Sequence, residues 1–302
     1  MRYITNDEII NLDISPASCY NWVREAFLFK DKCQLPPKMS VHPQGNDFIT
    51  TMPCLLPEAY HRFGVKVVSR IKGNHPSLRS DLMLFDTLTA QLMAVVQTDW
   101  ITGARTGAVA TLAIRTLRKP NTKTYAFIGL GNTATHTLAT LLCVEPDTMH
   151  HVNLFRYKDQ AEKFVAKFEN YTNVDFTICN TIEELVHDAD VFVSCITDAD
   201  GLIVKDPAIL KPGILIVPIH TRGFQNCDTV FDKVFADDTG HVKGFKYFNE
   251  FRQFGELSDV LSGKISGRDN ENQRILSYNI GLGLHDVYFA NKIYNILEVE
   301  NL

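Results

Sequence analysis

At 302 residues, the chain is long for a single core and sufficient for two domains. Its composition is that of an ordinary globular protein, with 45% hydrophobic residues, 22% charged residues and a formal net charge of −5. This charge balance gives no reason to expect binding to nucleic acid or to an anionic membrane surface.

Seven cysteines are scattered without a C-x-x-C pair, so we expect reduced thiols, as in a cytoplasmic protein. The first residues are polar and acidic where a signal peptide needs an apolar run, and no stretch reaches transmembrane length. The chain contains neither an H-E-x-x-H motif nor a helical pair of histidines, so we expect no metal site. The expected location is the cytoplasm.

The N-terminal part predicts an antiparallel sheet. Its β-type runs are separated by turn residues and cover Phe48 to Met52, Val65 to Ser69, Asp81 to Phe85 and Leu92 to Val96. Lys66 lies on the strand face opposite Val65 and Val67, and this alternation by itself favours a lysine exposed to solvent. Arg105 lies in the second turn of a helix expected from Trp100 to about Leu117. Its small neighbours leave room for a ligand or another backbone, although a surface arginine is an equal alternative.

A dinucleotide fingerprint follows in the middle of the chain. A strand from Thr124 to Ile128 runs into Gly129, Gly131 and Ala134 at the G-x-G-x-x-A spacing, and an apolar-periodic helix begins at once. The first glycine permits the tight turn, the second lets the backbone approach a pyrophosphate, and the alanine lets the helix pack close to its strand. The helix N-terminus would hold the phosphates.

The next predicted strand ends in Arg156-Tyr157-Lys158, where an NAD-selective domain carries an acidic residue for the ribose hydroxyls. Two cations at this place can instead bind a 2′-phosphate, which favours NADP over NAD. The alternative is a pair of solvated surface charges.

Two later apolar runs, Val191 to Ile196 and Ile214 to Ile219, are typical of strands buried in a parallel sheet. Ligands bind at the carboxyl ends of such strands, which places Thr197, His220 and Thr221 at the cleft. The alternation predicts a Rossmann-type doubly wound parallel sheet over residues 119–279. A last amphipathic helix could return to the first domain, giving an α+β domain of residues 1–118 plus 280–302.

Several of these features together resemble the ornithine cyclodeaminase/mu-crystallin family over nearly the whole chain. They are the Arg105-Thr106 pair, the lysine of Gly64-Val-Lys-Val-Val68, Met52-Pro53, the fingerprint, Gly255 to Arg268, and Gly281-Leu-Gly-Leu-His-Asp286. The resemblance implies a homodimer joined through the N-terminal sheets, and a Rossmann domain.

The resemblance also implies the site residues. The substrate carboxylate would be held by Lys66, Arg105 and a more N-terminal basic residue, here Lys38, where many members have arginine and its planar fork. The residues expected to bind the cofactor are Thr106, Gly129, Gly131, Asn132, Thr133, Ala134, Arg156, Lys158, Thr197 and Gly281.

The family's chemistries differ at one position. Cyclodeaminases carry a catalytic aspartate after the fifth Rossmann strand, where this chain has His220 or Thr221 and no aspartate. The first hypothesis is therefore hydride transfer between NADP or NAD and the α-carbon of a small amino or imino acid. Lys66 and Arg105 would orient the carboxylate, and His220 or Lys66 would serve the proton transfer. Cyclisation of L-ornithine to L-proline is the second hypothesis, and a non-catalytic NADP-dependent binding protein is the third.

Overall fold

The computed structural model describes residues 1–74, 78–199, 201–225 and 228–299. The chain divides into two compact units, one of residues 1–105 and 282–302 and the other of residues 106–281. We call them unit 1 and unit 2. The division falls within helix α3 (Asp99–Leu117), whereas the boundary expected from the sequence, 118/119, follows the end of this helix. The second division, after residue 281, lies two residues beyond the expected 279/280.

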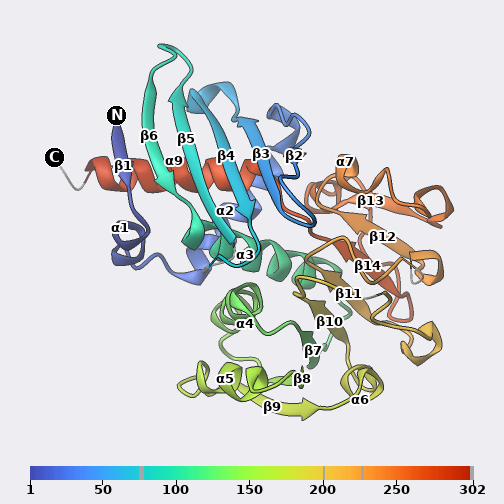
Figure 1. Cartoon of the computed structure of the whole chain (residues 1–302). Helices are drawn as coiled ribbons and strands as arrows, with labels where there is room; N and C mark the ends of the chain where they lie inside the picture. The colour runs from blue at the N-terminus through green and yellow to red at the C-terminus, as the bar shows by residue number, and fades with distance from the viewer. Residues whose placement is uncertain (75–77, 200, 226–227, 300–302) are drawn as a thin grey trace. The chain divides into compact units, whose positions relative to one another are not determined.

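Unit 1 contains a six-stranded sheet in the order β1-β6-β5-β4-β3-β2 (Figure 1). Its strands are β1 (Arg2–Ile4), β2 (Met39–Val41), β3 (Phe48–Leu55), β4 (Arg62–Arg70), β5 (Leu78–Asp86) and β6 (Leu92–Gln97). The predicted antiparallel pairing from β3 to β6 is confirmed. The structure adds β1, which pairs with β6 in parallel, and the edge strand β2.

The helices of unit 1 begin at residues that satisfy their free N–H groups. A capping box joins Thr5 and Glu8 at α1 (Asn6–Asn11), and the Ser15 side chain caps α2 (Pro16–Leu28). Short 3-10 turns follow at Lys30–Lys32 and Glu58–Tyr60. The long helix α9 (Gly283–Val299) crosses one face of the sheet and contacts β3, β4 and β5 (Figure 1). Alternate strand residues on that face are buried.

Unit 2 contains an eight-stranded, fully parallel sheet in the order β13-β12-β14-β11-β10-β7-β8-β9. Its strands are β7 (Thr124–Ile128), β8 (His150–Phe155), β9 (Val174–Cys179), β10 (Val191–Ser194), β11 (Leu215–Pro218), β12 (Lys233–Ala236), β13 (Phe254–Glu256) and β14 (Ile275–Tyr278). Every residue of β10, β11, β12 and β14 is buried, as expected for central strands with both faces covered.

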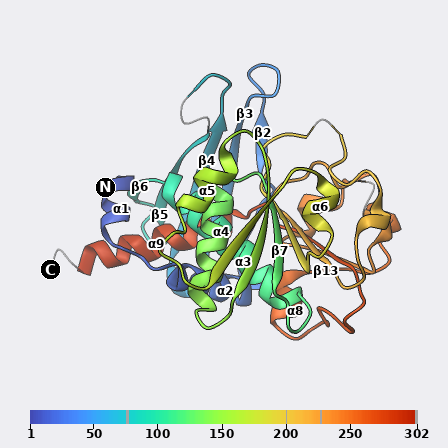
Figure 2. The same ribbon diagram turned by 90° about the horizontal axis from the view of Figure 1, so that it is seen from below.

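The helices of unit 2 connect these strands. They are α4 (Asn132–Val144), α5 (Gln160–Ala166), α6 (Ile182–Val186), α7 (Thr239–Val242) and α8 (Leu257–Leu261), with 3-10 turns at Pro207–Ile209, Asp228–Val230 and Phe248–Glu250. The chain runs outward from β7 to β9 and then returns to β10 on the other side of β7. Right-handed crossovers therefore place α4 and α5 on one side of the sheet and α6 on the other (Figure 2). The doubly wound Rossmann-type fold is confirmed, with its topological switch point between β7 and β10.

None of the helices in the described residues is long and apolar enough to cross a membrane.

Candidate active site

Lys66 is fully buried on the face of the unit 1 sheet that α9 covers. Its Nζ donates hydrogen bonds to Asp286 Oδ1, at 2.7 Å, and to Thr102 Oγ1, at 2.6 Å. The prediction of a solvent-exposed lysine, which the local pattern favoured, is therefore wrong. A buried ammonium needs such partners, because its desolvation would otherwise cost several kcal/mol.

Arg105 reaches the same carboxylate from α3. Its side chain is buried, and Nε donates to Asp286 Oδ1 at 3.1 Å. We call Lys66, Arg105 and Asp286 the charge cluster. Two cations and one carboxylate leave it with a net charge of about +1 in a buried place, which favours an additional anion. The Lys66 ammonium has a third N–H besides the two that bond to Asp286 and Thr102. In the described part of the chain, Arg105 bonds to Asp286 through Nε, so the two terminal nitrogens of its guanidinium can bind a ligand carboxylate.

The pKa values of the charge cluster follow from burial and from mutual attraction. Burial lowers the pKa of Lys66 to about 8, although the nearby Asp286 carboxylate opposes the shift. For Asp286, burial would raise the pKa, but Arg105 and Lys66 outweigh it and hold this pKa below its ordinary value. Both groups are therefore mainly ionised at neutral pH.

In unit 2, the fingerprint loop has the geometry that its two glycines permit. Gly129 has φ +79°, and a Cβ there would lie 2.6 Å from the carbonyl carbon of Cys195, so only glycine fits. A Cβ on Gly131 would meet no atom within 4 Å. This open space lies beside the start of α4, where a pyrophosphate would contact free N–H groups. The residues present therefore fit a dinucleotide.

A cavity of about 490 Å³ lies at the switch point, beside the carboxyl ends of β7, β8 and β10. Its lining residues are Ile128, Gly129, Gly131, Phe155, Tyr157, Gln160, Cys195, Ile196, Thr197 and Asp198. Of the residues expected to bind the cofactor, Gly129, Gly131 and Thr197 line this cavity. Asn132 and Thr133 begin α4, and Ala134 is buried in the same helix.

Arg156 and Lys158 flank the lining residue Tyr157 in the loop after β8. The Arg156 side chain is 44% exposed and forms an ion pair with Glu162 at 2.5 Å. The Lys158 ammonium lies 5.3 Å from the centre of the Tyr157 ring. Both cations therefore lie at the surface, near the end of the strand where a ribose would bind.

Thr106 and Gly281 are not among the lining residues of this cavity. Thr106 precedes Gly107 on α3, where a Cβ would lie 2.5 Å from the backbone of His136 on α4. The small residues around Arg105 thus let α3 pack closely on the fingerprint helix. Gly281 has φ +98° and donates its N–H to Asp237 Oδ2 at 2.5 Å, which joins the loops after β14 and β12.

His220 follows β11 and has both ring nitrogens engaged. Nδ1 accepts the Arg222 N–H at 3.3 Å, so Nε2 carries the proton that it shares with Ser194 Oγ at 2.7 Å. Burial lowers the pKa of His220 to about 4, which makes the imidazole neutral at neutral pH. Thr221 comes next, and its carbonyl oxygen accepts a hydrogen bond from Gln225.

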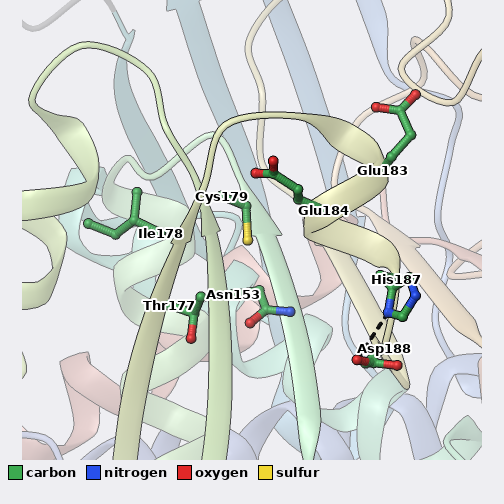
Figure 3. Close-up of a pocket in the computed structure, with 8 residues that line it drawn as sticks. All are labelled: Asn153, Thr177, Ile178, Cys179, Glu183, Glu184, His187 and Asp188. Carbon is green, nitrogen blue, oxygen red and sulfur yellow. Dashed lines mark ion pairs between the residues drawn. The ribbon is translucent and has the colours of Figure 1, made fainter.

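A second hollow of about 680 Å³ lies over β8, β9 and α6 (Figure 3). It is lined by Asn153, Thr177, Ile178, Cys179, Glu183, Glu184, His187 and Asp188. The carboxylates of Glu183 and Glu184 and the His187 to Asp188 pair come from α6 and the turn after it. None of the residues expected at the active site lines this hollow.

A model of the ornithine cyclodeaminase/mu-crystallin family matches residues 4–301. The chain belongs to this family. Nodulation efficiency protein NfeD of Rhizobium meliloti is 27% identical over 274 residues, which cover 87% of this chain and 84% of the relative. Delta(1)-pyrroline-2-carboxylate reductase of Bacillus thuringiensis subsp. konkukian is 24% identical over 257 residues, 78% of each chain.

The structure of Thermococcus litoralis Delta(1)-pyrroline-2-carboxylate reductase in complex with NADH and L-proline has the same fold as this chain. The TM-score is 0.87 at 21% identity, and the match covers 100% of this chain and 99% of the other. The fold of this member of the ornithine cyclodeaminase/mu-crystallin family is therefore that of a known nicotinamide-binding protein.

Within this family member, the structure brings Lys66 and Arg105 together, and it adds a residue whose role the sequence did not reveal. In the sequence, Asp286 is only the last residue of the family segment that begins at Gly281. The signal was present: Asp286 lies in the first turn of a helix whose residues from Gly283 to Asn291 are all buried. An acidic residue in such a place needs cationic partners. Lys38 lies partly buried directly before β2, and its part in substrate binding stays a prediction.

Proposed function

We propose that the protein is an NAD(P)-dependent oxidoreductase that transfers a hydride between the nicotinamide and the α-carbon of a small amino or imino acid. The observation that carries this proposal is the charge cluster. A buried site with net charge of about +1, a free N–H on Lys66 and a free guanidinium fork on Arg105 suits the carboxylate of such a substrate.

The cofactor would be held by the fingerprint loop. The open space at Gly131 and the start of α4 suit its phosphates, and the cavity at the switch point includes Thr197. When bound, the nicotinamide supplies or accepts the hydride.

The chain's own residues would orient the substrate and move a proton. Lys66 and Arg105 hold the carboxylate, and Asp286 keeps both cations in place. With a pKa of about 8, Lys66 can give a proton to the imine nitrogen and recover it near neutral pH. His220 is the second candidate in the proton transfer. Its neutral, hydrogen-bonded imidazole suits the ordering of a water better than the donation of a proton.

The named relatives support an imine as the substrate. The Bacillus thuringiensis relative is a pyrroline-2-carboxylate reductase, and the Thermococcus litoralis protein was solved with L-proline. The first name denotes a small cyclic imino acid and L-proline is the corresponding amino acid, and in both the carboxylate lies on the carbon bonded to nitrogen. We propose the same class here: a cyclic ketimine acid, or the imine formed from a 2-oxo acid and an amine.

We propose a preference for NADP over NAD, on the strength of Arg156 and Lys158. The ion pair between Arg156 and Glu162 is about half exposed, so it is worth little and leaves the guanidinium able to turn to a 2′-phosphate. The Thermococcus litoralis structure holds NADH, so this preference would belong to the present chain and not to every member of the fold.

We further propose a homodimer that forms through the sheet face opposite α9. On β4, Val65 and Val67 are partly exposed while Gly64 and Lys66 are buried, and Met83 on β5 is 39% exposed. An open apolar sheet face is a common site of association. The scattered thiols support the cytoplasm as the location of this dimer, which cell fractionation would test.

The test follows the oxidation of NADPH, and separately of NADH, with cyclic ketimine acids and with pyruvate or glyoxylate plus ammonia or an amino acid. L-ornithine with NAD serves as the cyclodeaminase control. We expect the cofactor to be consumed with an imine and no proline to form from ornithine. Proline formation with no imine reduction would contradict the proposal in favour of the cyclodeaminase. Bound cofactor with no turnover of any compound would contradict it in favour of a binding protein.

A further inference from the structure

Two cysteines of unit 1 that are distant in sequence lie together beside the charge cluster. Gln34 and Leu55 form an isolated antiparallel bridge, in which each backbone N–H donates to the carbonyl oxygen of the other at 3.0 Å. Cys33 and Cys54 each directly precede a bridge residue. Because side chains alternate along extended backbone, both cysteines point to the same side of the bridge, in a diagonal relation.

The two thiols influence one another. The pKa of the Cys54 thiol is raised well above its ordinary value, mainly by interaction with the Cys33 side chain and next by burial. Cys33 is partly exposed, and its Sγ lies 3.6 Å from the carbonyl oxygen of Phe29. Cys54 is fully buried, and both cysteines are free thiols in the structure.

The pair also adjoins the proposed substrate site. Cys54 lies on the buried face of β3, where its neighbour two residues earlier, Met52, pairs with Lys66 in the sheet. The charge of Asp286 also helps to raise the pKa of the Cys54 thiol. Cys33 begins the segment that leads to Lys38.

We propose that Cys33 and Cys54 form a reversible redox site, whose oxidation to a disulfide ties residues 33–38 to β3 and lowers the activity of the adjacent charge cluster. The formation of the disulfide is independent of the proposed function, whereas its effect on activity rests on that function. The bridge places the two cysteines at diagonal positions on one side of adjacent segments, from which two thiols can meet with a small adjustment of the backbone.

A peroxide is the oxidant in this step. The Cys33 sulfur attacks a peroxide oxygen, the O–O bond breaks, and Cys33 becomes a sulfenic acid while one water leaves. The Cys54 sulfur then attacks the Cys33 sulfur, the S–O bond breaks, and the second water leaves. In sum, two thiols lose two protons and two electrons, and hydrogen peroxide is reduced to two waters.

Burial fixes the order of these events. The oxidant reaches the partly exposed Cys33 first, and Cys54 then resolves the sulfenic acid from inside the protein. Because Cys54 remains protonated in its buried place, the second step is the slow one. A thiol reductant that reaches Cys33 reverses the reaction.

The experiment uses the full chain, treated with hydrogen peroxide, blocked with an alkylating agent, and examined by intact mass and peptide mapping. Imine reduction and NAD(P)H binding are measured before oxidation, after it, and after dithiothreitol. Cys33→Ser and Cys54→Ala are compared with Cys143→Ser, which changes a partly exposed thiol of unit 2 and leaves the pair intact.

We expect the oxidised wild type and Cys143→Ser to carry two alkyl groups fewer than their reduced forms and to yield a linked Cys33 and Cys54 peptide. Their activity should fall severalfold, recover with dithiothreitol, and leave NAD(P)H affinity unchanged, while Cys33→Ser resists the loss. Oxidation of Cys143 without a link between Cys33 and Cys54 would overturn the redox site. A complete link with unchanged activity would overturn its effect on the charge cluster. A reduced wild type that turns over no imine would refute the proposed function instead, while the mass measurement still decides the site.

Discussion

At the scale of single residues, three buried ionisable side chains of unit 1 depend on one another. Asp286 Oδ1 accepts hydrogen bonds from both Lys66 and Arg105, and removing this carboxylate would leave two like charges without a counter-ion. Loss of one partner of a buried ion pair costs about 3 to 5 kcal/mol in other proteins. The charge cluster therefore carries an excess positive charge in a buried place, which a bound carboxylate would neutralise.

The charged groups that act on Lys66 decide how its activity depends on pH. Asp286 on α9 and Asp99 on α3 favour its ammonium form, and burial and Arg105 oppose it. His285, next to Asp286, acts electrostatically on the Asp286 carboxylate, and this carboxylate also acts on the Cys54 thiol on β3. If the ammonium is the active form, kcat/KM should fall as the pH rises through about 8.

Asp286→Asn removes the charge that favours the ammonium, so the pKa of Lys66 falls further. We expect the alkaline decline of kcat/KM to move to lower pH by about one unit, with about a fivefold loss at pH 8. Thr102→Ser is the control, because it keeps a hydroxyl on Lys66 and changes no charge. Circular dichroism would establish that both variants fold. An alkaline decline at the same pH in Asp286→Asn would show that Asp286 does not set the protonation of Lys66.

The residue scale is also where the sequence was least informative. Strand alternation indicated which residues share a face with Lys66 but not which face would be covered. The covering helix α9 supplies Asp286 from 220 residues later in the chain. No local pattern reports a contact at that separation, so the local pattern favoured a solvated lysine.

At the scale of elements, the turn from β7 into α4 assigns different tasks to its two glycines. Gly129 has a positive φ and contacts the backbone of Cys195, whereas Gly131 has φ −89° and faces open space. The first glycine should serve folding and the second cofactor binding.

Gly129→Ala should lower the melting temperature by several degrees, since it strains the backbone and meets a main-chain atom at 2.6 Å. Gly131→Val should leave the melting temperature of the free protein nearly unchanged and weaken NAD(P)H binding at least about tenfold. Thermal unfolding and fluorescence titration measure the two effects. Equal cofactor affinity in Gly131→Val and the wild type would reject this loop as the phosphate site.

The loop after β8 carries the prediction on cofactor choice. Arg156→Asp should shift the ratio of kcat/KM for NADPH and NADH toward NADH by about tenfold or more, because it replaces a phosphate ligand with a repelling charge. Lys163→Asp, an equally large charge change on the exposed side of α5, is the matched control. An unchanged ratio in Arg156→Asp would remove Arg156 from the cofactor site.

Elements with strong local signals were predictable almost to the residue. The strand β7 has the expected bounds, and the capping box at Thr5 is present as the spacing indicated. The edge strand β1 was missed because three residues carry too little periodicity, and its parallel pairing with β6 depends on distant sequence.

At the scale of the whole molecule, the partly exposed apolar face of the unit 1 sheet leads to a prediction of the oligomeric state. Met83→Glu places a charge on the central strand β5, next to Val65 and Val95 on the neighbouring strands. We expect sedimentation analysis to show a dimer for the wild type and a monomer for this variant. Leu88→Glu, an exposed apolar residue in the turn after β5, should stay dimeric. If Met83→Glu is also a dimer, the interface does not lie on this face of the sheet.

The central claim is hydride transfer to the α-carbon of an imino acid, and an isotope label tests it most directly. The protein would be given the ketimine acid that it turns over and NADPH or NADH deuterated at the transferred position of the nicotinamide, and the product would be examined by mass spectrometry and NMR. The account predicts one deuterium on the α-carbon, and loss of this transfer in Lys66→Gln although the cofactor still binds. A product without deuterium at the α-carbon, or full transfer in Lys66→Gln, would contradict it.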